Sequence, residues 1–522
     1  MDLNNINQLE NATSSAKTEL VRISIALLFM FGVMIYVLEM SGGIDKHLLL
    51  VAAAVIGGYM ALNIGANDVA NNVGPAVGSK ALTMGGAILI AAIFEAMGAI
   101  VAGGDVVSTI KKGIINPEMI ADSDTFIWLM MAALFAAAIW LNIATFVGSP
   151  VSTTHSIVGG VLGAGIAAGG FGIADWAVFG KIAASWVISP LFGGVIAASF
   201  LYLIKRTITY QEEMLKAAQK VVPILVALMV WAFSTYLILK GLKKIWKVEF
   251  SSALMIGLTI AVTIFILCRP LIKAAAKKMS NTKESVNGLF TLPLIISAAL
   301  LSFAHGANDV ANAVGPLAAI NDAIFSGGVV SKATIPLWVM LVGAIGIAVG
   351  LALYGPKLIR TVGSEITELD KMRAFCVAMA ASITVIIASQ LGLPVSSTHI
   401  AVGAVFGVGF LREYLKRSYA VMIEEIKLHH IDDNPEAVEA YLIGFKSASI
   451  KIKGEMLIEL KANKTGLSLS KKERKGLKRI YNQEIVKRSH LYKIAAAWVI
   501  TVPVSALLAA LLYFTIRGFM LP

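Results

Sequence analysis

Long apolar runs recur along the whole chain and limit it to one class of fold. A helix needs about 20 mainly apolar residues to cross a hydrocarbon core roughly 30 Å thick. Mean hydropathy is +0.79, and only 15% of residues are charged. We therefore expect an all-α, multi-pass protein of the cell membrane, with about 11–12 transmembrane helices. The apolar runs lie near 20–40, 48–64, 83–103, 126–147, 176–204, 221–239, 251–268, 289–304, 335–354, 374–391 and 494–516.

Positive charge gathers in one polar stretch near the C-terminal end. The formal net charge is +12, and lysine and arginine outnumber the acids in 413–492. This stretch is typical of a cytoplasmic loop facing water and anionic headgroups, and its basic cluster lacks the interleaved aromatic residues of a nucleic-acid site. Three shorter basic connections, 205–220, 240–247 and 269–283, follow one another, although successive connections should alternate sides. Charge alone therefore leaves the orientation of the chain open.

Three short motifs occur twice, in the same order. The first pair matches at ten of eleven positions and the second at five of six. Such repeats, with interrupted apolar segments in corresponding places, point to a transporter binding site between two halves. The pairs are Gly65–Pro75 with Gly306–Pro316, Pro150–His155 with Pro394–His399, and Lys181–Ile188 with Lys493–Ile500.

The repeats divide the chain into segments, although the residues alone leave open whether the two copies run parallel or inverted. The basic loop is an insertion into the second copy only. We predict an N-terminal span at 1–45, repeat 1 at 46–206, connecting spans at 207–286, the first part of repeat 2 at 287–412, the loop at 413–492 and the closing span at 493–522.

The first motif places an acid inside an apolar run in each half. A carboxylate at membrane depth costs about 2.5–3.5 kcal/mol, so Asp68 and Asp309 need a compensating partner or a wet cavity. Gly65 begins the first copy and a Gly-Pro pair ends both copies, so we expect the helix to break or kink here. At a spacing of three, Asp68 shares a helix face with Asn71, and Asp309 with Asn312. Each half can present a carboxylate and an amide to one point.

Hydroxyl side chains gather in the second motif, at 152–154 and 396–398. Each group follows a proline and precedes a glycine-rich apolar stretch, which predicts a helix start. The apolar segments on either side are short for complete crossings, so we expect two re-entrant hairpins with hydroxyls at their tips. Free backbone N–H groups and the positive end of the helix dipole make such a tip an anion site.

Two aspartates beside an anion site conflict electrostatically. They would repel an oxyanion unless a cation lies between them or they are protonated. We therefore predict a symporter, in which the acids hold Na⁺ or H⁺ and the tips hold the oxyanion. An enzyme is not expected, because a hydrolase needs one asymmetric set of nucleophile, base and acid, whereas these groups are duplicated. An anion channel stays an alternative.

Ordinary structural roles stay open for some of these residues. Amides and hydroxyls also serve as caps and interhelical hydrogen bonds in membrane helices, although duplication in register argues against that here. His155 and His399 can act at the site or simply orient the tips. Glu95 is another acid in an apolar run, and Met340 stands at its matching place in the second half.

The duplicated motifs resemble the signatures of inorganic phosphate transporters of the Pit type, over nearly the whole chain. This family includes bacterial low-affinity permeases and animal sodium–phosphate cotransporters. The resemblance implies an all-helical fold of two inverted repeats with two re-entrant hairpins, phosphate bound centrally, and a homodimer. It implies no cofactor beyond the coupling ion.

The resemblance also assigns ligands by position. The coupling cation falls to Asp68, Asn71, Asp309 and Asn312, with Na⁺ a candidate at the two aspartates. The phosphate ligands are Asn67, Asp68, Asn71, Ser152, Thr153, Thr154, Asn308, Asp309, Asn312, Ser396, Ser397 and Thr398.

Two positions bear on the identity of the coupling ion. Glu95 stands where animal members carry a glutamate linked to phosphate transport, but their second such glutamate falls at Ala378. This difference argues against an animal-like sodium stoichiometry. Bacterial members are commonly proton-coupled and move phosphate as a neutral metal complex, so H⁺ is the preferred ion. Sulfate stays an alternative substrate, because the motifs do not exclude it.

Overall fold

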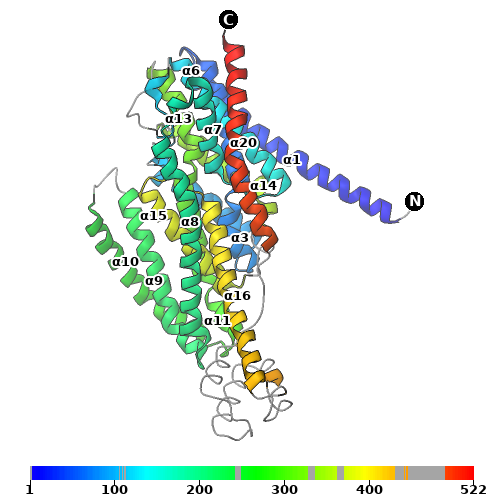
Figure 1. Cartoon of the computed structure of the whole chain (residues 1–522), viewed down its shortest axis with the longest axis vertical. Coiled ribbons are helices and arrows are strands. Elements are labelled where there is room, and N and C mark those ends of the chain that lie inside the picture. The colour runs from blue at the N-terminus through cyan, green and yellow to red at the C-terminus, as the bar shows by residue number, and fades with distance from the viewer. Residues whose placement is uncertain are drawn as a thin grey trace.

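The fold is an elongated bundle of helices (Figure 1). The computed structural model describes all residues except 1–2, 105, 108–109, 111–112, 121, 242–247, 327–334, 361–368, 430–439, 441, 445–487 and 522. The described part contains no strand, only one isolated bridge between Ile115 and Ala174. Its α-helices are α1 (Leu3–Met40), α2 (His47–Asn67), α3 (Ala70–Gly78), α4 (Met84–Ala102), α6 (Ser123–Val147), α7 (Thr153–Gly169), α8 (Trp176–Ile204), α9 (Met214–Gly241), α10 (Phe250–Ala276), α11 (Lys283–Leu289), α12 (Thr291–Asp309), α13 (Ala311–Ser326), α14 (Leu337–Arg360), α15 (Lys371–Gln390), α16 (Ser397–His429) and α20 (Arg488–Met520).

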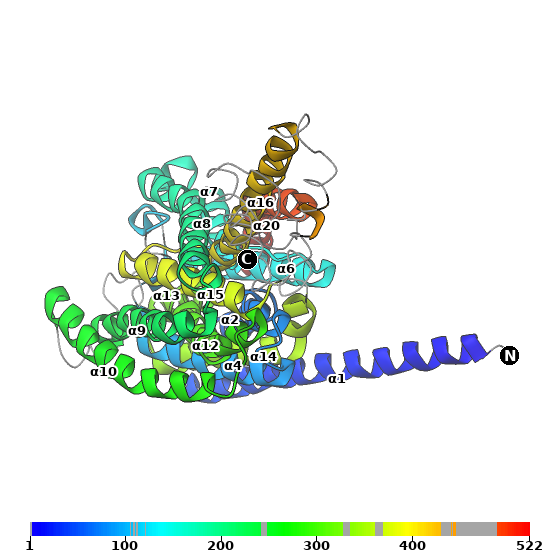
Figure 2. The ribbon, with the colours of Figure 1, turned by 90° about the horizontal axis from the view of Figure 1, so that it is seen from below.

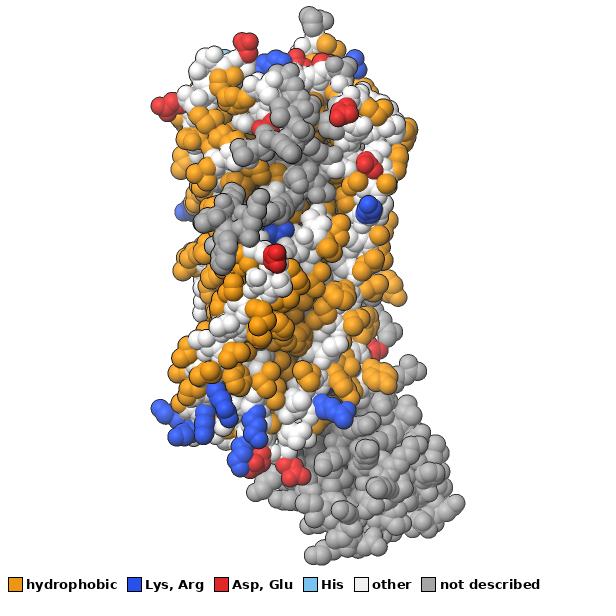
Figure 3. Space-filling view, turned by 90° about the vertical axis from the view of Figure 1, so that its left-hand side faces the viewer, with side chains coloured by type: hydrophobic (Ala, Val, Ile, Leu, Met, Phe, Trp, Pro, Cys, Tyr) orange, Lys and Arg blue, Asp and Glu red, His pale blue; other side chains and the backbone are white. Residues whose placement is uncertain are grey.

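Eleven candidate membrane spans lie in the described residues, one for each predicted apolar run. Hydrophobic side chains cover much of the middle of the face in Figure 3, as expected for a surface in contact with lipid. Helix α1 leaves the bundle sideways (Figures 1 and 2) and packs against α2 and α14. The prediction of an all-helical membrane protein is confirmed.

Two spans continue beyond their predicted apolar runs through a second helix. The runs at 48–64 and 289–304 extend into spans His47–Gly78 and Thr291–Ser326, because α3 follows α2 and α13 follows α12 almost without a gap. The added helices carry the polar and glycine-proline residues of the first motif, which lower local hydropathy. Burial inside the protein lets such polar helices stay at membrane depth.

The two halves of the chain interlock. Helix α2 of the first half packs against α14 of the second, and α12 of the second packs against α4 of the first. The same exchange joins α7 with α20 and α16 with α8. This pairing agrees with a repeated architecture, whereas the inverted direction of the copies, the re-entrant hairpins and the segment boundaries stay predictions.

Glycine makes this interlocking possible at two points. A Cβ on Gly65 would lie 1.9 Å from the backbone oxygen of Ile347 in α14, and a Cβ on Gly306 would lie 2.1 Å from that of Glu95 in α4. Both glycines therefore permit a close approach of helix backbones. Helix α2 continues through Gly65 to Asn67, so Gly65 itself does not end the helix.

Two of the three basic connections lie among the described residues. The connection at 205–220 and that at 269–283 lie at the same end of the bundle, because Asn281 donates to the Glu212 carbonyl (2.8 Å) and accepts from the Leu215 N–H (3.0 Å). Such placement restores the alternation of sides for α9 and α10. The predicted loop at 413–492 begins as helix, since α16 continues to His429, and most of the remainder lies outside the described residues.

Candidate functional site

Each copy of the first motif lies where one helix gives way to the next. Helix α2 ends at Asn67 and α3 begins at Ala70, while α12 ends at Asp309 and α13 begins at Ala311. Pro75 and Pro316 lie inside α3 and α13, where a proline cannot donate to the carbonyl four residues earlier. The predicted interruption is thus present: it covers Asp68 and Val69 in the first copy and the single residue Val310, next to Asp309, in the second.

Asp68 receives hydroxyl groups from both halves. Its Oδ2 accepts a hydrogen bond from Thr153 at the start of α7, and its Oδ1 accepts one from Thr398 at the start of α16. Asn71 donates to the Thr398 hydroxyl at 2.8 Å and to the Asp68 carbonyl at 2.9 Å. Two helix N-termini from different halves therefore converge on one carboxylate.

Asp309 belongs to the same hydrogen-bond network. Its Oδ1 accepts from Thr154 (3.1 Å) and from Asn312 (3.0 Å). Asn312 also donates to the Thr153 hydroxyl at 3.0 Å, so Thr153 links the two aspartates. We call this set of residues the central polar network, and each of its members is at most 1% exposed. It consists of Asp68, Asn71, Thr153, Thr154, Asp309, Asn312 and Thr398.

Two predicted ligand serines cap helices. The Ser152 hydroxyl accepts the N–H of His155 at 3.0 Å, and the Ser396 hydroxyl accepts that of His399 at 3.2 Å. These caps satisfy free N–H groups of the first turn, as the sequence predicts for a helix start. Ser397 is 2% exposed and begins α16 beside Thr398.

Two predicted ligand asparagines hold neighbouring segments. Asn67 donates to Thr145 at 3.0 Å and accepts from the N–H of Val151 at 3.1 Å, which fixes the connection between α6 and α7. Asn308 donates to Ser389 of α15 at 3.1 Å. Both side chains thus position the segments around the central polar network, and none of their hydrogen-bond partners among the described residues belongs to it.

His305 lies against this network, and the sequence analysis missed it. Its Nδ1 lies 2.7 Å from Glu95 Oε2, and its Nε2 lies 3.2 Å from Asp309 Oδ2 and 3.9 Å from Asp68 Oδ2. All four groups are buried. One atom each from Asp68, His305 and Asp309 lies within 4.8 Å of the others, a spacing that a single cation can bridge. The imidazole therefore connects Glu95 to both aspartates.

The differences between the two halves gather around His305. Asn72 donates to Glu95 at 2.7 Å, and Glu95 contacts His305. At the corresponding positions of the repeats, Ala313 replaces Asn72, Ile64 replaces His305, and Met340 stands for Glu95. The site therefore has a symmetric centre with one asymmetric ionisable arm. Polar residues that occur in only one of the two repeats are the sequence signal that would have identified this arm.

His155 and His399 lie in a stack of rings that involves the third repeated motif. His155 packs on Trp186 of α8, with ring centroids 3.8 Å apart, and His399 stacks on Trp498 of α20 at 3.7 Å. The two imidazoles meet edge to face at 4.3 Å. Neither contacts Asp68 or Asp309 among the described interactions. The geometry favours a role in holding the two hydroxyl-bearing helix starts together.

The central polar network can bind an anion only if a cation or a proton offsets the charge of its two carboxylates. Hydroxyl and amide groups supply neutral donors, and none of the described side chains that contact Asp68 or Asp309 is a lysine or arginine. Asn71 Oδ1 and Asn312 Oδ1 are buried without a hydrogen-bond partner among the described residues. Such amide oxygens, with the carboxylates, are suitable ligands for a hard cation.

A polar network between two repeated halves of a helical membrane bundle defines the class of protein. Transporters place their substrate and coupling-ion sites at the interface of such repeats, where helices are interrupted. The chain belongs to the phosphate transporter family, whose model matches residues 64–509. This match includes both copies of the two site motifs.

Similar proteins come from distant organisms. A Helicobacter pylori (strain J99) protein named "Putative phosphate permease" is 56% identical over 523 residues, 98% of each chain. Proteins named "Putative phosphate permease PYRAB14010" in Pyrococcus abyssi and "Putative phosphate permease" in Haemophilus influenzae are 38% and 40% identical. The matches cover 70% and 69% of this chain and 90% and 87% of theirs. A solved structure titled "The sodium-dependent phosphate transporter" has a TM-score of 0.74 and 31% identity, covering 91% of this chain and 100% of that one.

Proposed function

We propose that this protein imports inorganic phosphate by symport with a cation. Family membership supports phosphate as the substrate, and the solved neighbour is described as dependent on sodium. The observation that carries the proposal is the convergence of α7 and α16 on Asp68, each through a threonine at its N-terminus. That geometry places anion-binding helix ends and cation-binding carboxylates at one point.

The two ligands depend on each other electrostatically. Thr153, Thr154 and Thr398 donate to the aspartates and can donate to phosphate oxygens instead when their hydroxyls rotate. Phosphate near two buried carboxylates is strongly unfavourable until a cation neutralises part of the charge. Binding of the cation therefore has to accompany binding of phosphate, which is the coupling that symport needs.

His305 favours H⁺ as the coupling cation. A protonated imidazole beside Glu95 and Asp309 offsets their charges, and the repeat-related positions Ile64 and Met340 carry no ionisable group. Sodium, bound by the carboxylates of Asp68 and Asp309 with amide oxygens, is the second candidate. Transport of phosphate as a neutral metal complex, assembly as a homodimer and location in the plasma membrane remain part of the proposal.

The experiment is uptake of radiolabelled phosphate into proteoliposomes under an imposed pH gradient or an imposed Na⁺ gradient. We expect accumulation driven by acid outside, with Asp68→Asn and Asp309→Asn each abolishing it. Cation-driven accumulation at the normal level in both variants contradicts the proposed roles. Uptake driven only by Na⁺ assigns that ion.

Two further outcomes separate the alternatives. Sulfate that abolishes phosphate uptake makes the protein a sulfate carrier, and single-channel conductance in a planar bilayer makes it an anion channel. His305→Gln provides a separate test of the asymmetric arm, since it should reduce proton-driven uptake at least tenfold while leaving a Na⁺-driven component unchanged.

A further inference from the structure

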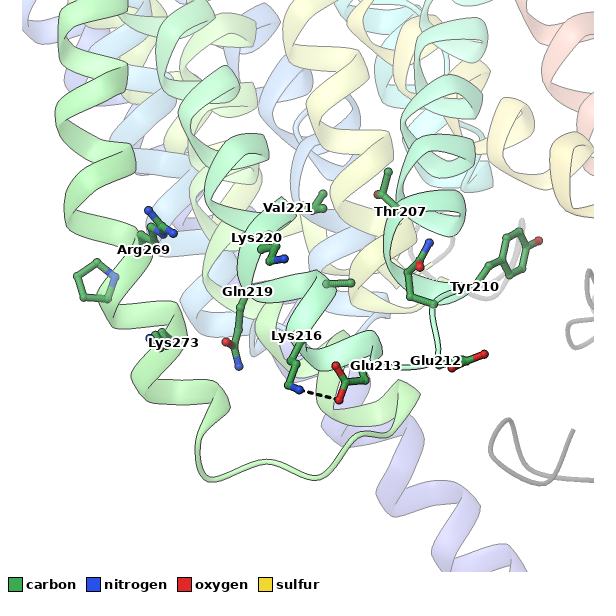
Figure 4. A pocket seen from close by; sticks show the side chains of 13 residues that line it. Thr207, Tyr210, Glu212, Glu213, Lys216, Gln219, Lys220, Val221, Arg269 and Lys273 are labelled. Atoms are coloured by element: carbon green, nitrogen blue, oxygen red, sulfur yellow. Dashed lines mark hydrogen bonds and ion pairs between the residues drawn. The ribbon is translucent and has the colours of Figure 1, made fainter. Parts of the chain in front are cut away.

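A groove between α9 and α10 lies at one end of the bundle, outside the repeats (Figure 4). It encloses about 970 Å³. At the opposite end the two helices touch closely, since a Cβ on Gly257 would lie 2.3 Å from the Thr235 hydroxyl. In the part of each helix that is nearer the groove, a proline interrupts the backbone hydrogen bonding: Pro223 in α9 and Pro270 in α10. The helices therefore pack tightly at one end and enclose a groove at the other.

Four cationic side chains line this groove. Lys216 and Lys220 come from α9, while Arg269 and Lys273 come from α10. Each pair is spaced by four residues, so each helix turns two cations toward the same side. Like charges at this spacing destabilise a helix, and two antiparallel helices with the same pattern add to the repulsion. A bound anion would relieve this repulsion.

The acids of the groove neutralise only part of this charge. Glu213 pairs with Lys216 at 2.7 Å, and Glu212 points away from the space between the helices (Figure 4). The side chains of Lys220, Arg269 and Lys273 form no hydrogen bond or ion pair with a described residue. Three cations in one groove thus lack a protein counter-charge in the described part of the chain.

The surroundings of the groove match those of a lipid headgroup. Leucines on α10 next to Arg269 are strongly exposed, Leu267 at 56% and Leu271 at 67%, and Ile224 on α9 is exposed at 55%. Figure 3 shows lysine and arginine side chains along the lower edge of the hydrophobic surface. The groove therefore lies at the boundary where apolar surface meets charge, which is the depth of phospholipid headgroups.

We propose that the groove binds the phosphodiester headgroup of an anionic phospholipid. Arg269 and Lys220, one turn deeper than Lys273 and Lys216, contact the phosphate, and the acyl chains lie on the exposed face of α10. A lipid is favoured over free phosphate because the groove combines cations with continuous apolar surface. This inference does not depend on the transport proposal, since none of its residues belongs to the central polar network.

The test measures lipid binding by the full-length protein. Purified protein in detergent is titrated with phosphatidylglycerol, with phosphatidylcholine or with inorganic phosphate, and bound lipid is counted by native mass spectrometry. We expect one tightly bound phosphatidylglycerol per chain, and Arg269→Gln/Lys273→Gln should weaken its binding at least roughly tenfold. The matched control is Lys277→Gln/Lys278→Gln, which removes two cations just beyond the same helix end without touching the groove.

Three results would overturn the proposal. If Lys277→Gln/Lys278→Gln weakens phosphatidylglycerol binding equally, the lipid is attracted by general surface charge and not by the groove. Equal binding of phosphatidylcholine means that the headgroup charge is not recognised. Binding of inorganic phosphate but not of phosphatidylglycerol, when that binding is lost in Arg269→Gln/Lys273→Gln, assigns the groove to a soluble anion. If the double variant does not fold, Lys220→Gln removes one cation from the other helix and gives the same comparison.

Discussion

The Thr153 hydroxyl links the two aspartates through Asn312. Its hydroxyl donates to Asp68 and accepts from Asn312, which in turn donates to Asp309. Thr153→Val keeps the shape but removes the hydroxyl, leaving buried polar groups without a partner. Because a hydrogen bond to a charged group contributes about 1.5–3 kcal/mol, we expect phosphate uptake to fall roughly 10- to 100-fold in proteoliposomes.

Thr153→Ser is the matched control for this prediction. Serine keeps the hydroxyl and loses only a methyl group, so uptake should stay within about threefold of the original. If both variants lose uptake equally, packing of the methyl group matters and the hydroxyl does not. A normal Thr153→Val protein would remove Thr153 from the site.

The acids and hydroxyls of the site could be predicted from the sequence, but the histidine could not. Duplication in register marked Asp68, Thr153 and Thr398, because an expensive polar group that occurs twice has a reason to be there. His305 occurs once, directly after an apolar run, and its three acidic neighbours come from other helices or from the next turn. Only tertiary packing brings those groups together.

Helix packing between the halves depends on glycine at the contact points. In Gly306→Ala the new methyl group would meet the Glu95 backbone at 2.1 Å, which neither helix can relieve by a rotamer change. Overpacking of this kind costs about 1–3 kcal/mol. We expect a lower melting temperature and a lower folded yield, measured by size-exclusion chromatography after heating in detergent.

Gly85→Ala serves as the control within α4. No atom lies within 4 Å of the Cβ that alanine would add there, and alanine favours helix over glycine. Its melting temperature should be unchanged or slightly higher. Equal destabilisation of both variants would show that the loss arises from a general sensitivity of these helices to substitution and not from the contact with Glu95.

The start of α6 should make a small contribution to stability that depends on pH. Asp122 caps this helix by accepting from the Thr125 N–H at 2.7 Å, and this hydrogen bond lowers the pKa of Asp122 below its ordinary value. A lowered pKa stabilises the folded state at neutral pH, and the contribution disappears as pH falls through the folded pKa. Acidification from pH 7 to 3 should therefore lower the melting temperature more in the original protein than in Asp122→Asn, by ~1–2 °C. Identical pH profiles would contradict this role.

The element-level prediction succeeded for spans and failed at the polar helices that extend them. All eleven runs became candidate spans, since a long apolar run has few alternatives to a membrane helix. Helices α3 and α13 were not foreseen as continuations, because their asparagines, glycines and prolines resemble a loop when neighbours are ignored. Both helices pack against the other half, where Asn71 of α3 and Asn312 of α13 find hydrogen-bond partners, and hydropathy alone carries no information about those contacts.

At the scale of the whole molecule, the interlocking of the halves predicts that neither folds alone. Each of α2 and α12 has its main partner in the opposite half. Chains 1–245 and 246–522 expressed separately should be degraded or aggregate, whereas coexpression should restore a complex that copurifies and takes up phosphate. A separately expressed half that is monodisperse and stable in detergent would contradict this prediction.

The same exchange of partners has a consequence for how the protein is made. Helix α2 ends at Asn67, but α14, on which it packs, begins only at Leu337. At ~5–20 residues per second, a ribosome needs on the order of tens of seconds to reach that partner. During this interval the acid-bearing helices of the first half are in or near the bilayer with their packing faces uncovered. The insertion machinery or a membrane chaperone should therefore hold the nascent first half. Crosslinks to that machinery from residues on the face of α2 that carries Gly65 should vanish once α14 has emerged.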